Sequence, residues 1–426
     1  MTQYLYPGVY VEEVTPLARP ITGVGTSTAG FIGVVMDDVQ MPLKPGKKED
    51  DVTGHFTVSP AGEPQLITGW EQFKNNFGDF QPTKKQKSLT AEKEPEKEPV
   101  EEPAEEPENE GSAGWSDDDY KAYLQLQHAV YGFFNNGGTR CWVIRVATGG
   151  SLTNLADLLN KFEPIDDIAI VAVPGAITTA QQDAIIGHCV NMKDRVAVLD
   201  GIQSPSTFTV DGIKGDTHTS EYAALYFPWI KVLDPISQTN ISQPPSGHLA
   251  GVYARVDAER GVFKAPANEI VLGAVDLDYK LSPNDQAGLN PKGVNVIRAF
   301  DGNFNIWGAR TLGGDDNGEF KYISTRRYFN FLRKSIEQGT QFVVFEPNSP
   351  ALWQRITRTV SDFLLRQWRD GALFGDTPKQ AFFVKCDKDT NPPEVREAGQ
   401  VVTEIGVAIV KPAEFVIFRI QQTTGE

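Results

Sequence analysis

The residues that could perform nucleotide or nucleophile chemistry are present but do not fall at the required spacings. No glycine-rich run ends in Gly-Lys-Ser/Thr, the arrangement that cradles nucleotide phosphates. Gly25-Thr26-Ser27-Thr28-Ala29 approaches a nucleophile elbow, but that motif requires a strand, a turn and a helix, and here an apolar strand-like run follows. Gly23-Val24-Gly25 lacks the third glycine of a dinucleotide fingerprint. We interpret Gly23 and Gly25 as a hinge.

The ligand-type residues do not predict a metal site either. The five histidines never stand at metal-ligand spacing, and the three cysteines, Cys141, Cys189 and Cys386, form no CxxC motif. The acidic run at 315–319 lacks the alternating oxygen ligands and the distant bidentate Glu of an EF-hand loop. We therefore expect no cofactor, no metal and no enzymatic activity. An α/β hydrolase-like enzyme remains an alternative. Widely separated cysteines also favour a reducing compartment during assembly.

Charge is concentrated in one segment of the chain. The net charge of the 426 residues is −16, which argues against a nucleic-acid partner because phosphates require a surplus of Lys and Arg. Residues 91–119 hold 13 acidic residues and two lysines, so this segment alone carries −11 and the rest of the chain only −5. Prolines at 95, 99, 103 and 107 forbid a continuous helix, and few apolar residues are available for a core. We predict a solvated, extended insertion over 81–119.

A basic segment stands out against this acidic background. Residues 321–370 contain nine Lys and Arg against four Asp and Glu, a net charge of +5. Two interpretations remain open: a solvated helix face, or an electrostatic contact surface for an acidic partner. The candidates for such a surface are Arg326, Arg327, Arg333, Lys334, Arg355 and Arg358.

Strand and helix patterns alternate through the middle of the chain, which indicates an α/β fold with a largely parallel sheet. Apolar runs predict strands at 31–35, 141–146, 168–173 and 195–199, and helical spacing predicts helices at 70–77, 120–134, 152–162, 179–192 and 221–230. Residues 234–318 read as loop-rich, with a strand at 293–298. The end of the chain reads as a separate unit, with helices at 325–337 and 350–369 and strands at 341–345, 381–386, 401–410 and 415–420.

Both ends of the chain carry an isolated β-prone run next to prolines. The first contains Val9, Tyr10, Val11 and Val14, and the last contains Phe415, Val416, Ile417, Phe418 and Ile420. A lone strand cannot satisfy its own backbone, so each needs a sheet supplied by a partner. The longest apolar run, 168–173, is too short to span a bilayer, and we expect no membrane insertion and no secretory signal.

Several blocks of sequence resemble the contractile tail sheath proteins of phages and phage-like injection systems. The blocks are YPGVYVEEV, HAVYGFFNNGGTRCWVIRV, SGHLAGVYARVDAERGVFKAPAN, LNPKGVNVIRAFDG, LWQRITRTVSDFLLRQWRDGALFGDTPKQAFFVKCD and VKPAEFVIFRI. They follow in order along nearly the whole chain. The compact length and the final block are most similar to sheaths of extracellular injection systems of the antifeeding-prophage type. The insertion at 81–119 departs from the family pattern.

The resemblance implies a mixed multi-domain sheath fold: an α/β middle domain, an α+β C-terminal core domain and strand-donating arms. We accordingly expect an arm at 1–25, an outer domain at 26–320 and an inner domain at 321–426 that ends in a second arm at 411–426. The family implies hexameric rings stacked helically around an inner tube, which contract to drive the tube through a target envelope. The basic candidates would then face the tube, and Gly23 and Gly25 would let the arm stay docked while the body moves.

The resemblance also implies partners and a location. The partners are other copies of the chain, an inner tube protein, baseplate and terminal cap proteins, and, as an open question, sister sheath subunits. Assembly is expected in the bacterial cytoplasm, as part of a phage-tail-like particle whose release from the cell is left open. A non-contractile, ring-forming interaction protein is a further alternative.

Overall fold

The chain divides into two compact units in a computed structural model. The structure describes all residues except 1–19, 49–50, 52, 82–114, 148–151 and 418–426. Among the described residues, the large unit comprises those in 25–331 and 411–417, and the small unit comprises 20–24 and 332–410. The division therefore falls inside helix α9 (Ile323–Gly339) and not at the expected position 320, and the segment after residue 410 belongs to the large unit. The predicted strand at Val9–Val14 lies outside the described residues.

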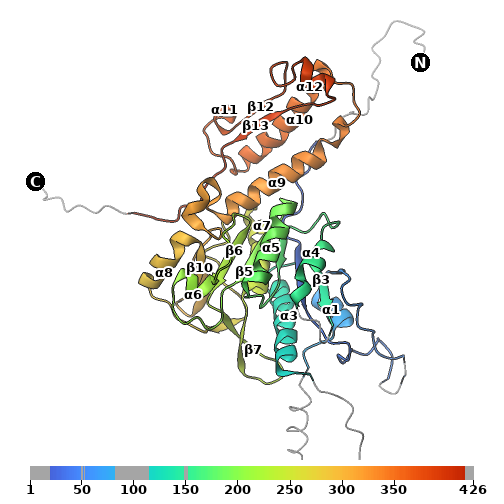
Figure 1. Cartoon of the computed structure of the whole chain (residues 1–426), viewed down its shortest axis with the longest axis vertical. Coiled ribbons are helices and arrows are strands. Elements are labelled where there is room, and N and C mark those ends of the chain that lie inside the picture. Colours follow the sequence, from blue (N-terminus) through green and yellow to red (C-terminus); the bar gives the residue numbers. More distant parts are fainter. Residues whose placement is uncertain (1–19, 49–50, 52, 82–114, 148–151, 418–426) are drawn as a thin grey trace, which may run out of the picture. The chain divides into compact units, whose positions relative to one another are not determined.

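An eight-stranded sheet forms the centre of the large unit (Figure 1). Its order is β11-β10-β6-β5-β4-β1-β3-β2, with the six strands from β10 to β3 parallel and the two edge strands antiparallel. The strands are β1 (Ala29–Val34), β2 (Gln65–Ile67), β3 (Cys141–Val146), β4 (Ile170–Ala172), β5 (Val196–Asp200), β6 (Ala223–Phe227), β10 (Val294–Phe300) and β11 (Asn303–Ile306). The predicted α/β class is confirmed.

Helices cover both faces of this sheet. Alternate strand residues point to opposite faces, so Phe31 joins one buried apolar cluster and its neighbour Ile32 joins the other. The first cluster includes residues of α1 (Trp70–Phe77), α3 (Asp117–Asn135) and α7 (Ser246–Arg260). The second includes residues of α4 (Leu155–Asn160), α5 (Thr179–Met192), α6 (Val210–Lys214) and α8 (Pro283–Leu289). The short 3-10 turns are η1 (Leu152–Asn154), η2 (Asn290–Lys292) and η3 (Gly314–Phe320).

The helix predicted at 221–230 is wrong. Ala223–Phe227 is strand β6, between β5 and β10, and all five residues are buried. A strand covered on both faces is a continuous apolar run, which periodicity cannot distinguish from a buried helix. Residues 230–233 begin a second, three-stranded sheet of order β8-β7-β9, made of β7 (Ile230–Leu233), β8 (Asn240–Gln243) and β9 (Ala274–Leu277). The supposedly loop-rich stretch also contains the 15-residue helix α7.

The small unit packs a short sheet on a long helix. Its elements are the second part of α9, η4 (Gln341–Val343), α10 (Pro350–Arg369), α11 (Pro378–Ala381), β12 (Phe382–Lys385), α12 (Pro393–Glu397) and β13 (Glu404–Val407). Leu352, Ile356, Val360 and Phe363 form the buried stripe of α10. The strand predicted at 341–345 is wrong, because the amide groups of Val343 and Val344 close tight turns on Thr340 and Gln341.

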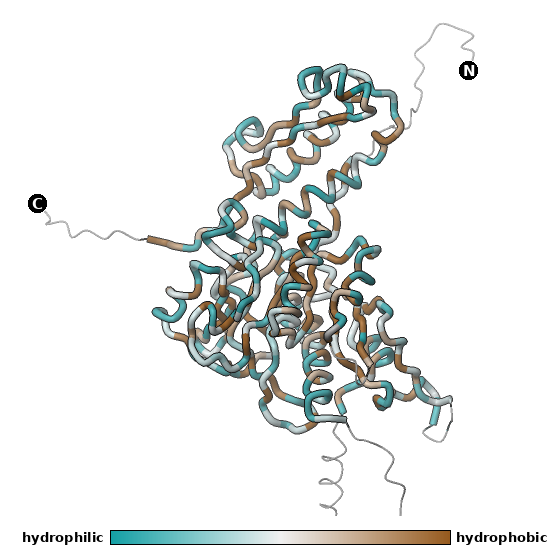
Figure 2. The backbone as a smooth tube through the Cα atoms, in the orientation of Figure 1, coloured by the Kyte–Doolittle hydropathy of each residue, from teal (hydrophilic) through white to brown (hydrophobic). Residues whose placement is uncertain are grey.

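The final predicted strand is not formed in the described part of the chain. Phe415, Val416 and Ile417 belong to no strand, and residues 418–420 lie outside the described residues. The apolar stretch at the end of the described chain extends away from the body of the large unit (Figure 2). No helix of the described residues is long and apolar enough to cross a membrane.

Candidate assembly surfaces

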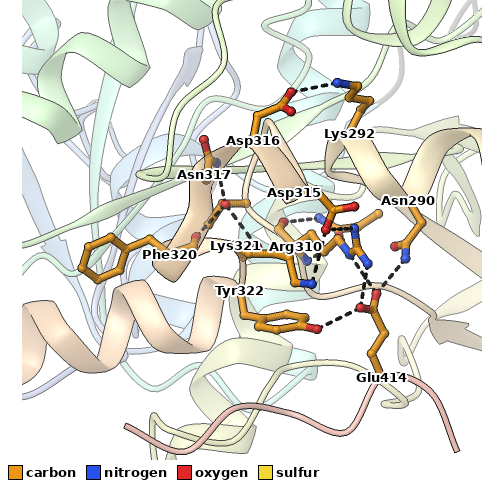
Figure 3. Close-up of polar contacts among 12 residues, drawn as sticks. Asn290, Lys292, Arg310, Asp315, Asp316, Asn317, Phe320, Lys321, Tyr322 and Glu414 are labelled. Carbon is orange, nitrogen blue, oxygen red and sulfur yellow. Dashed lines mark hydrogen bonds and ion pairs between the residues drawn. The ribbon is translucent and has the colours of Figure 1, made fainter. Parts of the chain in front are cut away.

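The root of the C-terminal segment is bound to the large unit through one carboxylate, that of Glu414. Arg310 donates from Nε to Oε1 at 2.9 Å and from Nη2 to Oε2 at 2.8 Å. Asn290 Nδ2 donates to Oε1 at 2.6 Å, and Tyr322 Oη donates to Oε2 at 2.9 Å. Figure 3 shows the four groups converging on the two oxygens. Paired Arg–carboxylate hydrogen bonds are strong and geometrically specific, so this contact defines where Glu414 lies.

The strand framework holds Arg310 in place for this contact. Asn295, buried in β10, accepts from the Arg310 amide at 2.7 Å and donates to its carbonyl at 2.8 Å. The Arg310 side chain is only 3% exposed and also pairs with Asp315 at 3.0 Å, which in turn pairs with Lys321 at 3.3 Å. We name Asn290, Arg310, Tyr322 and Glu414 the Glu414 clamp.

The electrostatics of the clamp favour the charged carboxylate. Burial by itself would raise the pKa of Glu414, but the hydrogen bonds from Arg310, Asn290 and Tyr322 outweigh burial and hold that pKa below its ordinary value. Burial also opposes the charge on Arg310, and its bonds to Glu414 and Asp315 raise its pKa in compensation. The clamp is therefore an ion pair at neutral pH.

The three residues that follow Glu414 are apolar and uncovered. Phe415, Val416 and Ile417 are 72%, 69% and 79% exposed. Three consecutive exposed apolar residues on an otherwise well-buried unit are typical of a segment that is covered by a partner. Phe418 and Ile420 lie outside the described residues, as do Val9, Tyr10, Val11 and Val14 of the N-terminal run.

In the described part of the small unit, the two-stranded sheet has one edge with no partner strand. β12 and β13 are antiparallel, with Phe382 opposite Val407 and Lys385 opposite Glu404, and the described residues add no third strand of comparable length. Ala408 donates to the Ala381 carbonyl at 2.8 Å, on the β12 side. Successive residues direct their amide groups to opposite edges, so Ile405 and Val407 direct theirs to the outer edge of β13.

A buried asparagine, Asn391, holds the segment just before β13 in position. Asn391 accepts from the Val402 amide at 2.7 Å and donates to the Val402 carbonyl at 3.0 Å. It also donates to the Asp387 carbonyl at 3.0 Å, which ties the loop after β12 to the segment just before β13. One face of the sheet packs on α10, and the opposite face exposes Phe383, whose ring lies over Gly406.

The predicted hinge glycines lie where the chain passes between the two units. The Val24 amide donates to Ser335 Oγ at 3.1 Å, and the Ile21 carbonyl accepts from Arg366 at 2.7 Å, both within the small unit. Thr26 Oγ1 donates to Asp257 at 2.6 Å within the large unit. Gly23 and Gly25 are exposed, and a side chain at Gly25 would meet no atom within 4 Å. Their role as a hinge stays a prediction.

Two of the predicted tube-facing residues are buried in the large unit, so their assignment to an exposed surface is wrong. Arg326 pairs with Glu221 at 2.7 Å and lies 4.0 Å from the centre of the Phe320 ring. Arg327 pairs with Asp257 at 2.6 Å, and both side chains are almost completely buried. Helical spacing alone does not say which basic residues face inward, and these two satisfy carboxylates from other elements.

The remaining basic candidates belong to the small unit and keep their charges nearer to solvent. Arg333 and Arg358 are exposed, and Lys334 and Arg355 are half-buried. Arg355 pairs with Glu346 at 3.2 Å and lies over the Phe342 ring. Arg358 lies on the exposed side of α10, opposite its apolar stripe. Whether these residues face a tube stays a prediction.

The described residues contain no group of three or more His, Cys, Asp and Glu placed to hold a metal ion. Sequence reasoning missed the Glu414 clamp, because its members are far apart along the chain. The only signal for it was a single acidic residue directly before the last apolar run. Such a signal does not identify a partner 104 positions away.

Comparisons with known proteins agree with the earlier resemblance. The family model described as "Phage tail sheath protein central domain" matches residues 147–312. The family model described as "Phage tail sheath C-terminal domain" matches residues 315–423. The tail sheath protein of Burkholderia phage BcepMu is 25% identical over 214 residues, which cover 48% of this chain and 44% of that protein. The chain thus spans about half the length of the curated relatives it matches.

Two solved assemblies match the chain over almost its full length. One is the cryo-EM structure of an extracellular contractile injection system, the PVC sheath complex in the contracted state, with TM-score 0.71, 27% identity and coverage of 99% of each chain. The other is the 6-fold symmetrised baseplate of the anti-feeding prophage (AFP), with TM-score 0.70, 27% identity and coverage of 99% of this chain and 100% of that one. With both domain descriptions matched over more than half of its length, the chain belongs to the phage tail sheath family.

Proposed function

We propose that the protein is a structural sheath subunit that polymerises as stacked hexameric rings around an inner tube. Contraction of the polymer would drive the tube through a target envelope. The observation that carries the proposal is the match over 99% of the chain to a sheath complex in the contracted state. The 6-fold symmetry of the AFP assembly supports hexameric rings.

Strand exchange between copies accounts for the exposed features of both units. Among the described residues, no strand pairs with the outer edge of β13, and the exposed apolar segment Phe415–Ile417 belongs to no strand. An extended segment that joins a sheet edge satisfies both sets of backbone groups at once. We infer that the C-terminal run, together with the N-terminal run around Val9–Val14, completes the β12–β13 sheet of neighbouring copies.

The energy for contraction would be stored in the assembly. Sheath contraction fits rigid-body rotation of subunits from a metastable to a better-packed arrangement, which requires no nucleotide. The terminal strands would keep neighbours linked while Gly23 and Gly25 absorb the change of direction between arm and body. Arg358 and Arg333 are the exposed cations that fit a contact with an acidic tube, since solvent-accessible ion pairs are individually weak and release readily.

The remaining partners follow from the same role. We infer contacts with an inner tube protein, with baseplate and terminal cap proteins, and with sister sheath subunits where the particle contains them. The AFP match comes from a baseplate assembly, which supports a baseplate contact. We also propose that the subunits assemble in the bacterial cytoplasm and form part of a phage-tail-like extracellular particle. The two alternatives, a hydrolase-like enzyme and a non-contractile ring protein, gain no support from these relatives, which are tail sheath proteins.

Negative-stain electron microscopy of the purified chain, with and without its tube protein, tests the proposal. A sheath subunit gives hollow ridged cylinders, and their length follows that of the tube when the tube is present. Closed single rings that do not assemble on the tube would favour the non-contractile ring protein. Discrete globules under all conditions would favour the enzyme alternative.

A further inference from the structure

The chain passes from the small unit to the large unit shortly before the C-terminal run. It is hydrogen-bonded to the small unit just before this passage and to the large unit just after it. On the small-unit side, Val410 donates to the Ala372 carbonyl at 3.2 Å. On the large-unit side, Glu414 enters the Glu414 clamp. Only residues 411–413 separate the two bonded positions. The segment that emerges after Glu414 therefore starts from the large unit, although the 79 residues before it, 332–410, belong to the small unit.

The clamp is a built site and not a chance surface ion pair. Surface ion pairs between long, mobile side chains contribute little, because ordering them costs entropy. Here the guanidinium of Arg310 is 3% exposed and the Glu414 side chain 17% exposed, and Asn295 fixes the Arg310 backbone from both sides. Both carboxylate oxygens receive two donors each. Directly after this residue, every described side chain is mostly exposed.

We propose that Glu414 is a positioning residue that makes the root of the C-terminal arm part of the large unit. The inference rests on the proposed function, in which residues after 414 add to the sheet edge of a second copy. The clamp sets the point and the direction from which the arm leaves the large unit. This reduces the conformational entropy that the arm loses when it adds to a sheet as a strand. A pull on the docked arm is transmitted through Arg310 to the central sheet, and the small unit of the same copy does not bear it.

The arrangement has a consequence for the polymer. The acceptor sheet β12–β13 belongs to the small unit, whereas the donor segment is anchored in the large unit. Each link between copies then joins the large unit of one copy to the small unit of the next. Without the clamp, the last hydrogen-bonded residue before the arm would be Val410. The four residues after Val410 would then be part of the free arm, which would start from the small unit instead.

The test uses the full chain with two spin labels, because the three native cysteines are buried. Labels on cysteines introduced at Ala258, an exposed position of α7, and at Val416 report the distance from the body of the large unit to the arm root. We expect a narrow distance distribution in the parent. Glu414→Gln, and Glu414→Gln combined with Tyr322→Phe, should broaden it. Glu394→Gln, an exposed glutamate of α12, is the matched control and should not.

Polymerisation of the same variants, without labels, is the second readout. We expect Glu414→Gln to raise the concentration needed for sheath formation by about tenfold, as for loss of one charge-assisted hydrogen bond. A narrow distribution in both clamp variants would refute the anchor, and a broad distribution with parental polymerisation would refute its positioning role. A chain that ends at Glu414 separates the two ideas: if it polymerises like the parent, strand donation by the C-terminal arm fails, whatever the clamp variants show.

Discussion

Arg327 and Asp257 form an ion pair with 2.6 Å between Nη2 and Oδ2, and their side chains are 3% and 5% exposed. Arg327 lies on α9 and Asp257 on α7. The same two residues hold the chain before β1, since Thr26 donates to Asp257 at 2.6 Å and its carbonyl accepts from Arg327 at 3.1 Å. The pair thus connects three segments of the large unit that are distant in sequence.

We expect Arg327→Met to lower the free energy of unfolding by about 3–5 kcal/mol, because it leaves the Asp257 carboxylate buried without its cation. Urea denaturation of the purified chain measures the change. Arg260→Met, at an exposed position of the same helix as Asp257, is the control and should stay within about 0.5 kcal/mol of the parent. A loss below about 1 kcal/mol in Arg327→Met would contradict the importance of the pair.

The contact between α3 and α7 depends on a glycine. A Cβ at Gly251 would overlap the Phe133 carbonyl and lie 2.8 Å from Asn136 Cβ. We expect Gly251→Ala to destabilise the chain by about 1–3 kcal/mol through overpacking, despite the better helix propensity of Ala. Gly187 of α5 has no atom within 4 Å of that position, so Gly187→Ala should stabilise by up to about 1 kcal/mol. The thermal unfolding midpoints of the two variants check both expectations. Equal shifts of the two midpoints in the same direction would contradict the explanation by overpacking at Gly251.

Acid should weaken the large unit through His188. Burial, and then the nearby Arg195 guanidinium, lower the pKa of His188 to about 4, while Asp194 opposes this shift. The unfolded chain binds the proton near the ordinary value of 6.5, so protons favour unfolding and stability is lost as the pH falls from 6.5 toward 4. Relative to His188→Gln, the parent should lose roughly 1 kcal/mol between pH 7 and pH 5.5, with solvent screening allowed for. Parallel urea midpoints for the two proteins across this range would speak against the assignment.

Binding to the tube should depend on the exposed side of α10. We expect Arg358→Glu to reduce co-sedimentation of sheath with preformed tubes several-fold, and more strongly at low salt, because solvent-exposed ion pairs are screened. Arg260→Glu makes the same charge change on an exposed residue of the large unit and should co-sediment normally. Unchanged binding of Arg358→Glu at low salt would remove α10 from the tube contact.

The N-terminal run should be needed between copies and not within one. We expect deletion of residues 1–15 to abolish sheath assembly and to leave a folded body with the thermal unfolding midpoint of the parent. Electron microscopy and circular dichroism measure the two properties. Normal sheaths from this truncation would end the idea that the N-terminal run donates a strand.

The amino-acid sequence by itself determined the α/β class, the family resemblance and the position of most central strands. These features depend on local patterns: the short apolar run at Cys141–Val146, for example, predicts a strand and forms β3. The β-prone residues 341–345 show the limit, because they form a tight turn and not a strand. The helix predicted over Ala223–Phe227 was wrong for a related reason. This strand is buried on both faces, and such burial removes the periodicity that separates a strand from a helix.

Only the tertiary structure decided which charged residues face one another. Arg326 and Arg327 read as part of a basic surface, yet Glu221 and Asp257 neutralise them inside the large unit. Arg310 and Glu414 are 104 positions apart and carry no shared local pattern. A buried ion pair forms where packing brings two side chains together, and this depends on how the whole chain closes around its sheet.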